Sequence, residues 1–291
     1  MKFYQLFKYM QEITSQKPKI TLPHDTFLQK LLSNNYKYFF IFQYYAKSTT
    51  SGIYGFLLGQ FSDIIQNLSI AYIWILNNAS PQIITYLIIG RTYKAISDTF
   101  FAEILGPDIS TGQITKHLMI PQNYIHFSIF RELGRRVVFN LTRALSYGFI
   151  LIIYAGFIDW SHFSLVKIAL LIPLLPISFL STFFLEFLVG TQAFFVRDKR
   201  NFSGIHRAYN GISGVLSGIL IPLDKLPFYN VIQFLPTSWL LHHPMQIYLG
   251  KYDTFQTILV FFGGISWCIL LYFLAKLVFK LGLKRNESVG L

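Results

Sequence analysis

Long apolar runs recur from residue 53 almost to the end of the chain, and they constrain the fold more than any other feature. Hydrophobic residues make up 53% of the 291 residues and charged residues only 13%, whereas roughly 25% of residues carry charge in soluble domains. A helix needs about 20 apolar residues to cross the hydrocarbon layer of a membrane. The runs therefore predict an all-α integral membrane protein.

Six of these runs are long enough for one transmembrane helix each. The second carries Arg91, Lys94, Asp98 and Glu103, which a lipid-facing helix would not tolerate, so it must face protein or water. The fifth is short and rich in glycine, and small residues let helices approach closely in lipid. We expect both in the interior of the bundle. The predicted spans are residues 53–76, 81–105, 136–158, 163–196, 204–222 and 254–281.

The distribution of positive charge predicts the orientation of the bundle. With six spans both termini share one side of the membrane, and most Lys and Arg fall in the segments on that side. The opposite side holds only Lys167, Lys225 and Lys251. The positive-inside rule then places both termini in the cytoplasm. The formal net charge of +12 is thus explained without a nucleic-acid partner, because the charge is spread over separate loops.

Two flanking segments are apolar but do not read as spans. Residues 31–52 mix aromatic residues with Asn and Lys, which predicts an amphipathic helix along the inner leaflet or, alternatively, a soluble helix packed on a partner. Residues 221–252 are broken by four prolines, which predicts short re-entrant helices on the outer side, or else an ordinary outer loop. We divide the chain into an N-terminal cytoplasmic extension, residues 1–31, and one transmembrane domain, residues 32–291.

Motifs for nucleotide binding, metal binding and hydrolysis are missing from the sequence. It contains no G-x-x-x-x-G-K-[ST] phosphate-binding loop, no H-E-x-x-H, no C-x-x-C and no G-x-S-x-G. Adjacent histidines on a helix point about 100° apart, so His242 and His243 are unsuited to hold one metal ion together. We therefore predict no catalytic residue, no metal site and no cofactor in this chain.

Ionisable residues inside the predicted spans are the remaining candidates for chemistry. Asp63, Arg143 and Glu186 lie deep in the first, third and fourth spans, where an unpaired charge is costly. An ion pair between Glu186 and Arg143 is one explanation, and a proton or substrate site is the other. Lys94 and Asp98 stand four residues apart and can neutralise one another on one helix.

Three segments resemble ABC exporter permeases of the ABC-2 type. The first, EILGPDISTGQITKHLMIPQNYIHFSIFRELGRR, has an acidic-Ile-x-x-Gly pattern followed by Leu and Pro, at Asp108, Ile109, Gly112, Leu118 and Pro121. The second, IPLDKLPFYNVIQFLPTSWLLHHPMQIYLGK, has the prolines that precede the last span in that family. The third is the basic tail LGLKRNESVGL. Their order and spacing make chance agreement improbable.

The resemblance implies a six-helix permease subunit in the plasma membrane of a prokaryote. Two such chains, identical or related, would form the substrate pathway and pair with separate ATPase subunits that bind ATP and Mg²⁺. The loop from Asp108 to Pro121 would be the coupling element, with a turn at Gly112 and an N-terminal cap from Asp108 or Ser110. The short helix presented to the ATPase would contain Gln113, Ile114, Lys116, His117 and Leu118.

Two other functions remain open from the sequence. An ion- or proton-coupled secondary transporter could use Glu186 or Asp63, although we detect no inverted repeat. A membrane-embedded lipid-modifying enzyme could use His242, His243 and Asp253 on the outer side.

Overall fold

The computed structural model describes residues 27–49, 53–119, 122–196 and 199–287, and the regular structure in these ranges is entirely helical. The chain divides into one unit that ends at Phe39 and a second that runs from Phe40 to Leu291. The α-helices are α2 (Phe27–Thr49), α3 (Ile53–Leu76), α4 (Pro81–Ser97), α5 (Ala102–Ser110), α6 (Ile114–Leu118), α7 (Tyr124–Ile153), α8 (Leu165–Thr191), α9 (Lys199–Leu216), α10 (Tyr229–Ile232), α11 (His242–Tyr248) and α12 (Thr254–Glu287).

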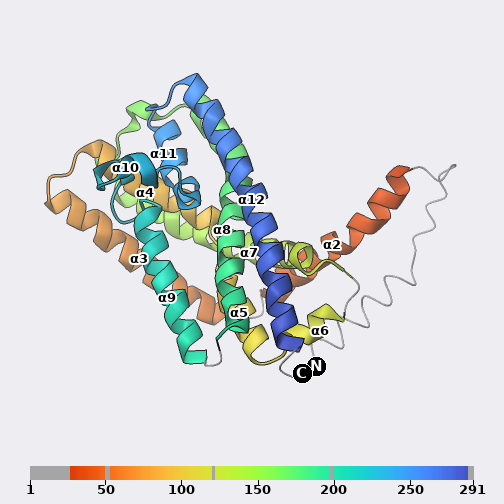
Figure 1. Cartoon of the computed structure of the whole chain (residues 1–291). Coiled ribbons are helices and arrows are strands. Elements are labelled where there is room, and N and C mark those ends of the chain that lie inside the picture. The colour runs from red at the N-terminus through yellow and green to blue at the C-terminus, as the bar shows by residue number, and fades with distance from the viewer. Residues whose placement is uncertain (1–26, 50–52, 120–121, 197–198, 288–291) are drawn as a thin grey trace. The chain divides into compact units, whose positions relative to one another are not determined.

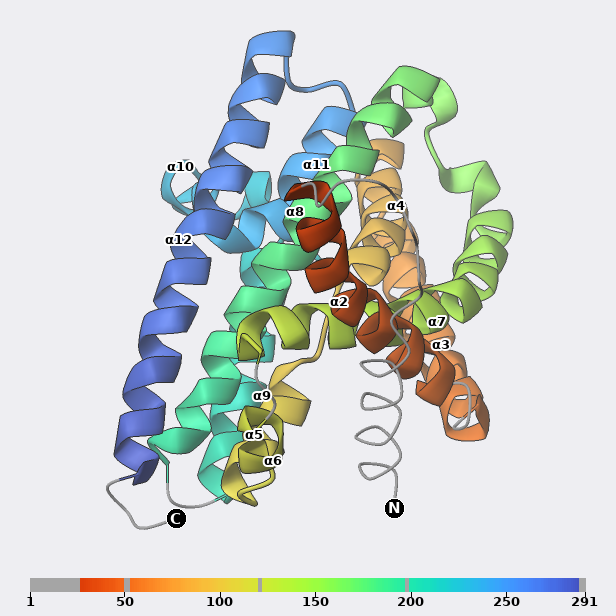
Figure 2. The same ribbon diagram turned by 90° about the vertical axis from the view of Figure 1, so that its right-hand side faces the viewer.

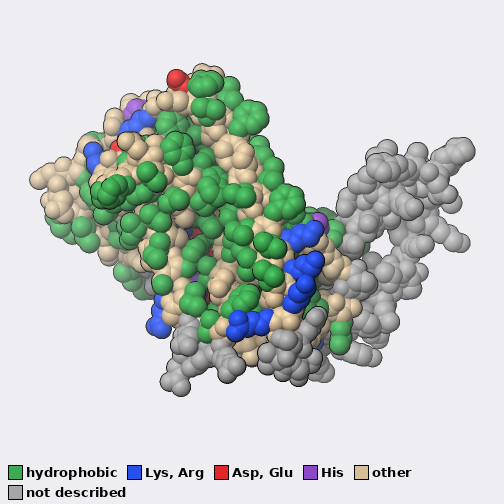
Figure 3. Space-filling model, viewed as in Figure 1, with side chains coloured by type: hydrophobic (Ala, Val, Ile, Leu, Met, Phe, Trp, Pro, Cys, Tyr) green, Lys and Arg blue, Asp and Glu red, His purple; other side chains and the backbone are tan. Residues whose placement is uncertain are grey.

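Helices α8 and α12 pack side by side along the second unit (Figures 1 and 2). Residues Leu165–Phe194 and Thr254–Arg285 are both long and apolar enough to cross a membrane. One side of α12 exposes large apolar side chains such as Phe255, Phe262 and Phe273. A large exposed apolar surface of this kind is typical of contact with lipid. Hydrophobic side chains cover much of the face in Figure 3, and Lys and Arg gather beside the lower end of α12.

The residues between α9 and α12 form a compact layer against one end of α8. Short 3₁₀ turns, Leu223–Lys225 and Pro236–Leu240, alternate with α10 and α11. Trp239 donates its indole N–H to the carbonyl of Val260 at 2.8 Å, and the Ser178 hydroxyl donates to the carbonyl of Trp239 at 2.7 Å. Pro222 and Pro236 stand at the starts of the two 3₁₀ turns and Pro244 in the first turn of α11, where a missing backbone N–H costs little. Whether this layer is re-entrant in the membrane stays a prediction.

The second predicted span, residues 81–105, is interrupted in the structure. Helix α4 ends at Ser97, and Asp98 adopts an extended backbone before α5 begins at Ala102. Lys94 Nζ lies 3.0 Å from Asp98 Oδ2, which confirms the predicted pair. The break is explained by tertiary contacts that hydropathy does not reveal. Thr99 is fully buried and its hydroxyl donates a hydrogen bond to Glu132 of α7. The ring of Phe101 packs against those of Phe183 and Phe187.

Helix boundaries elsewhere follow the predicted spans to different degrees. Helix α3 has the predicted bounds, and α12 begins where the last span was expected and runs on to Glu287. Helix α7 begins at Tyr124, twelve residues before the predicted start of the third span, because Asn123 caps it by accepting the amides of Ile125 and His126. Beyond the two apolar helices, the membrane-crossing roles of α3, α4, α7 and α9 stay predictions.

The contact of Trp239 with α12 yields a test of the fold. A Cβ at Gly264 would stand 2.6 Å from Ile177 Cγ2 and 2.8 Å from Trp239 Cδ1. We expect Gly264→Val to separate α12 from α8 and lower the free energy of unfolding by about 1–3 kcal/mol, the usual effect of overpacking. Thermal unfolding in detergent measures it. Ser266→Val, on the exposed side of α12, is the matched control, and equal midpoints for both variants would contradict the packing.

Candidate functional site

The predicted coupling segment contains the end of α5 and the whole of α6. Both lie beside the last turns of α12, and α10 and α11 lie at the opposite end of α8 (Figure 1). Gly112, between α5 and α6, has a φ of 71°, a conformation that favours glycine. The predicted turn at Gly112 and the short helix after it are therefore present. Pro121 lies outside the described residues, and α6 already ends at Leu118.

The N-terminal cap predicted for α6 is wrong. Asp108 and Ser110 lie inside α5, where the Ser110 hydroxyl donates to the carbonyl of Gly106 at 2.8 Å. Asp108 Oδ2 instead lies 3.4 Å from Arg131 Nη1 on α7. The residue that precedes α6 is Gln113, whose side chain makes no cap hydrogen bond. The sequence pattern misled because Asp108 and Ser110 still belong to α5, and a non-helical turn at residues 111–113 separates them from α6.

The two apolar residues expected to face a partner have different surroundings. Ile114 is fully buried within the chain, whereas Leu118 is 38% exposed. Met119, which the sequence analysis did not single out, is 82% exposed, and Gln113 and Lys116 are exposed beside it. Ile114 thus anchors α6, and the surface open to a partner is formed by Leu118, Met119 and their polar neighbours.

His117 is half-buried, and its ring packs toward α7. Its ring centroid lies 5.4 Å from that of Phe127 and 6.4 Å from that of Tyr124. Burial, with the positive charge of Arg131 nearby, lowers the pKa of His117 to about 4. The imidazole is therefore neutral at neutral pH, and it contributes aromatic packing to the base of α6.

Helix α5 packs tightly against α8 and α9. The ring of Phe202 on α9 fills the space that a side chain at position 106 would need, so Gly106 permits the close approach. On its other side Leu105 is fully buried against Gly190 of α8, where an added Cβ would stand 2.9 Å from Leu105 Cβ. These contacts make α5 a wedge between two helices of the bundle.

A buried carboxylate holds the start of this wedge. Glu186 of α8 is 2% exposed, and its Oε2 accepts the backbone amide of Ala102, the first residue of α5, at 3.0 Å. His206 Nε2 of α9 lies 3.6 Å from the same oxygen. The free amides at a helix N-terminus need acceptors and attract negative charge. One side chain therefore joins α5, α8 and α9.

The pair considered between Glu186 and Arg143 is not formed. Arg143 belongs to α7, which packs on α3 and α4, while Glu186 points from α8 toward α5 and α9. Sequence alone places both residues near the middle of their spans but does not tell which faces meet. The side chain of Asp63 lies outside the described part of the structure.

A second buried carboxylate, Glu132, was missed by the sequence analysis. Its Oε1 accepts hydrogen bonds from Arg136 Nε at 2.9 Å and from the Thr99 hydroxyl at 3.2 Å. Its Oε2 accepts a hydrogen bond from Arg135 Nη1 at 3.2 Å. Thr99 lies in the link between α4 and α5, so this cluster ties the link to α7. The sequence did contain a signal for this cluster, because Arg135 and Arg136 follow Glu132 by three and four residues and so lie on the same face of a helix.

The adjacent histidines of α11 are used by the fold. The carbonyl of Gln233 lies 2.8 Å from His243 Nε2, which must therefore donate, leaving Nδ1 to accept from the Tyr252 hydroxyl at 2.9 Å. His242 is fully buried near Tyr229 and Gln246. Among the residues that the structure describes, no three His, Cys, Asp or Glu gather as metal ligands would.

We expect Glu132→Gln to destabilise the protein by about 3–5 kcal/mol, because Arg136 would keep a buried charge without its carboxylate. Glu103→Gln, an exposed carboxylate of α5, is the control and should unfold like the parent. Adding Arg136→Gln to Glu132→Gln should recover part of the loss in thermal unfolding. A double variant less stable than Glu132→Gln alone would contradict this view.

Comparison with protein families supplies the identity. A family model described as ABC-2 family transporter protein matches residues 75–290, which include α5, α6, the layer before α12 and α12 itself. Comparison with curated proteins and with solved structures found no match. The helical architecture with two clearly apolar helices agrees with a membrane component of a transporter. On the strength of this match over most of its length, the chain belongs to the ABC-2 family of transporter proteins.

Proposed function

We propose that this chain is the membrane subunit of an ATP-driven exporter, with both termini in the cytoplasm of a prokaryotic cell. Separate ATPase subunits would bind ATP and Mg²⁺ and drive it through α6. The chain itself, as a permease of the ABC-2 family, is a transport component. Two permease chains, identical or related, would enclose the substrate pathway.

The observation that carries the proposal is the continuous path of contacts from α6 into the bundle. Met119 and Leu118 offer an exposed apolar surface, and Ile114 anchors the same helix in the protein. Through Gly112 the chain continues into α5, which is wedged between α8 and α9 and held by Glu186. Because packed elements move as units, a displacement of α6 would be passed to α8 and α9.

The exposed side of α9 supports the pairing of two permease chains. Ser203, Arg207 and Asn210 are all exposed on this helix. A charged and polar helix face within a bilayer is costly unless protein or water covers it. A second permease chain, or a water-filled pathway between two chains, would provide that cover.

The contacts of Glu186 favour a structural role over proton-coupled transport. Its carboxylate already receives a backbone amide, faces a histidine and is only 2% exposed. The three helices that it joins all belong to the proposed path from the ATPase. A secondary transporter would instead need a carboxylate that water can reach from each side in turn.

The proposal predicts that the exposed end of α6 contacts the ATPase. We expect Leu118→Asp with Met119→Asp to leave the bundle folded but weaken ATPase association at least tenfold, which is about 1.4 kcal/mol. Charge in a buried apolar contact is strongly unfavourable, so co-purification and permease-stimulated ATP hydrolysis should both fall.

Two further variants separate loss of coupling from loss of folding. Phe228→Asp introduces one negative charge at a residue that is 80% exposed in the layer at the other end of α8, and the variant should retain the ATPase. Ile114→Asp should instead destabilise the chain, because that side chain is fully buried. If the Leu118 and Met119 double variant assembles and stimulates hydrolysis like the parent, α6 is not the coupling element.

The proposed orientation has its own test. In a Cys268→Ser background, we expect Lys225→Cys to react with a membrane-impermeant maleimide added to intact cells. Lys284→Cys should react only after the membrane is opened, because the basic end of α12 is assigned to the cytoplasm. Both lysines are exposed in the chain, so access depends on the membrane alone. The reverse labelling pattern would overturn the orientation.

A further inference from the structure

Three exposed lysines form a row along the last turns of α12. Lys276, Lys280 and Lys284 stand four residues apart, which puts them on one face of the helix in steps of about 6 Å. Helix α12 contains no Asp or Glu before Glu287, so Lys276 and Lys280 have no carboxylate within one turn of their own helix. Figure 3 shows Lys and Arg side chains gathered beside this end of α12. This lysine row presents a strip of positive charge on the surface.

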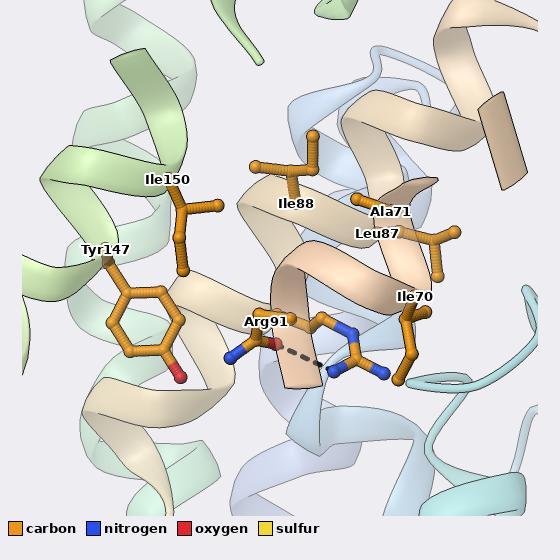
Figure 4. Close-up of a pocket in the computed structure, with 8 residues that line it drawn as sticks. Ile70, Ala71, Leu87, Ile88, Arg91, Tyr147 and Ile150 are labelled. Carbon is orange, nitrogen blue, oxygen red and sulfur yellow. Dashed lines mark hydrogen bonds between the residues drawn. The ribbon is translucent and has the colours of Figure 1, made fainter. Parts of the chain in front are cut away.

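The buried arginines of the bundle, Arg91 and Arg136, hydrogen-bond within the chain instead. Arg91 of α4 donates to Asn67 Oδ1 of α3 at 2.7 Å (Figure 4). It also donates to the carbonyl of Ile219 at 3.2 Å. Arg136 Nε lies 2.9 Å from Glu132 Oε1. The side chains of the lysine row are exposed, so a ligand from outside the chain can reach their charges.

A row of exposed apolar side chains runs beside the lysine row. Phe273, Leu277 and Leu281 are all exposed and repeat at the same four-residue spacing. Toward the start of α12, Ile269 and Phe262 continue this exposed apolar surface. A cationic strip beside an apolar one suits a molecule with an anionic headgroup and hydrocarbon tails.

The lysine row begins at the depth where the hydrocarbon layer of a membrane would end. The stretch of α12 from Thr254 to Ala275 carries no charged residue and extends over about 33 Å at 1.5 Å per residue. The hydrocarbon layer itself is about 30 Å thick. Tyr272, one turn before Lys276, stacks on His126 of α7 with ring centroids 6.1 Å apart, and Tyr is enriched at membrane interfaces. Lys276 would therefore stand at the level of the lipid phosphates.

We propose that the lysine row binds the phosphate of an anionic phospholipid, whose acyl chains lie along the exposed apolar row. Long lysine side chains reach headgroups from the edge of the apolar layer, and their charge attracts anionic lipid. A cytoplasmic protein fits this position less well, because Lys276 stands beside exposed Phe273 and Leu277 on the surface that would face lipid. The site requires α12 to cross the membrane, and it is independent of whether ATP drives the transporter.

Native mass spectrometry of the full chain in mild detergent tests the site. The parent and a variant with Lys276→Gln, Lys280→Gln and Lys284→Gln are titrated with phosphatidylglycerol and, separately, with phosphatidylcholine, which carries no net charge. One lysine near an anionic lipid surface strengthens binding about fivefold. We therefore expect the triple variant to bind phosphatidylglycerol at least tenfold more weakly, with phosphatidylcholine binding unchanged. Equal phosphatidylglycerol affinity in the triple variant and the parent would refute the proposal.

Two controls separate the position of the charges from their number. Replacing the whole lysine row by Arg keeps the charge and should preserve phosphatidylglycerol binding. A variant with Arg207→Gln, Lys225→Gln and Lys251→Gln removes three positive charges from exposed residues outside α12, and it should bind like the parent. If this control loses as much phosphatidylglycerol affinity as the triple variant, the effect belongs to net charge and the site is wrong.

A free anion or an acidic surface of the ATPase would give different results. Inorganic phosphate is added to the parent and to the triple variant, and thermal unfolding is recorded. If phosphate alone stabilises the parent through the lysine row as well as phosphatidylglycerol does, the apolar row has no part and the lipid site is wrong. Weaker co-purification of the ATPase by the triple variant, with phosphatidylglycerol binding intact, would assign the row to the ATPase and also overturn the proposal.

Two single variants keep the test decisive if the triple variant fails to fold. Lys276→Gln alters one exposed residue and should weaken phosphatidylglycerol binding about fivefold. Leu277→Asn leaves every charge in place and interrupts the apolar row, so it should weaken binding of phosphatidylglycerol and phosphatidylcholine alike. Folded proteins of both kinds with the affinities of the parent would overturn the site.

Discussion

The arrangement of α5, α8 and α9 depends on the carboxylate of Glu186, which is buried between these three helices. It accepts the first amide of α5 and faces His206, so α5, α8 and α9 meet at one side chain. A buried carboxylate requires donors, and the free amides of a helix start require acceptors. The same hydrogen bond meets both requirements. It fixes the start of α5 so that Leu105 packs on Gly190 of α8 and Gly106 packs on Phe202 of α9.

Charges elsewhere in the chain are handled in two contrasting ways. At the link between α4 and α5, Glu132 gathers Arg135, Arg136 and Thr99, so the charges are largely neutralised within the protein. Arg91 has only neutral partners among the described residues. Breaking a satisfied cluster leaves a buried charge unpaired and mainly affects stability.

Predictions based on a single helix face or a single turn agreed best with the structure. The bounds of α3, the turn at Gly112 with the short helix after it, and the pair of Lys94 with Asp98 each depend on residues close in sequence. One local prediction was wrong, because Asp108 and Ser110 lie inside α5 and do not cap α6. The other errors arose where distant segments decide. The break after Ser97 depends on Thr99 reaching Glu132, and the burial of Ile114 depends on how α6 seats against the rest of the chain.

The sequence by itself determined that the chain is helical, apolar and related to ABC-2 permeases, because composition, hydropathy and ordered motifs are properties of the chain alone. Only the tertiary structure decided which polar side chains meet: Glu186 with Ala102 and His206 in place of Arg143, and Arg91 with Asn67 beside a hollow. The physical reason is that the rotation of each helix, which sets the face it turns to its neighbours, is settled by the packing of all the helices together. The spacing of apolar residues along one helix does not specify that rotation when the helix is apolar on most sides.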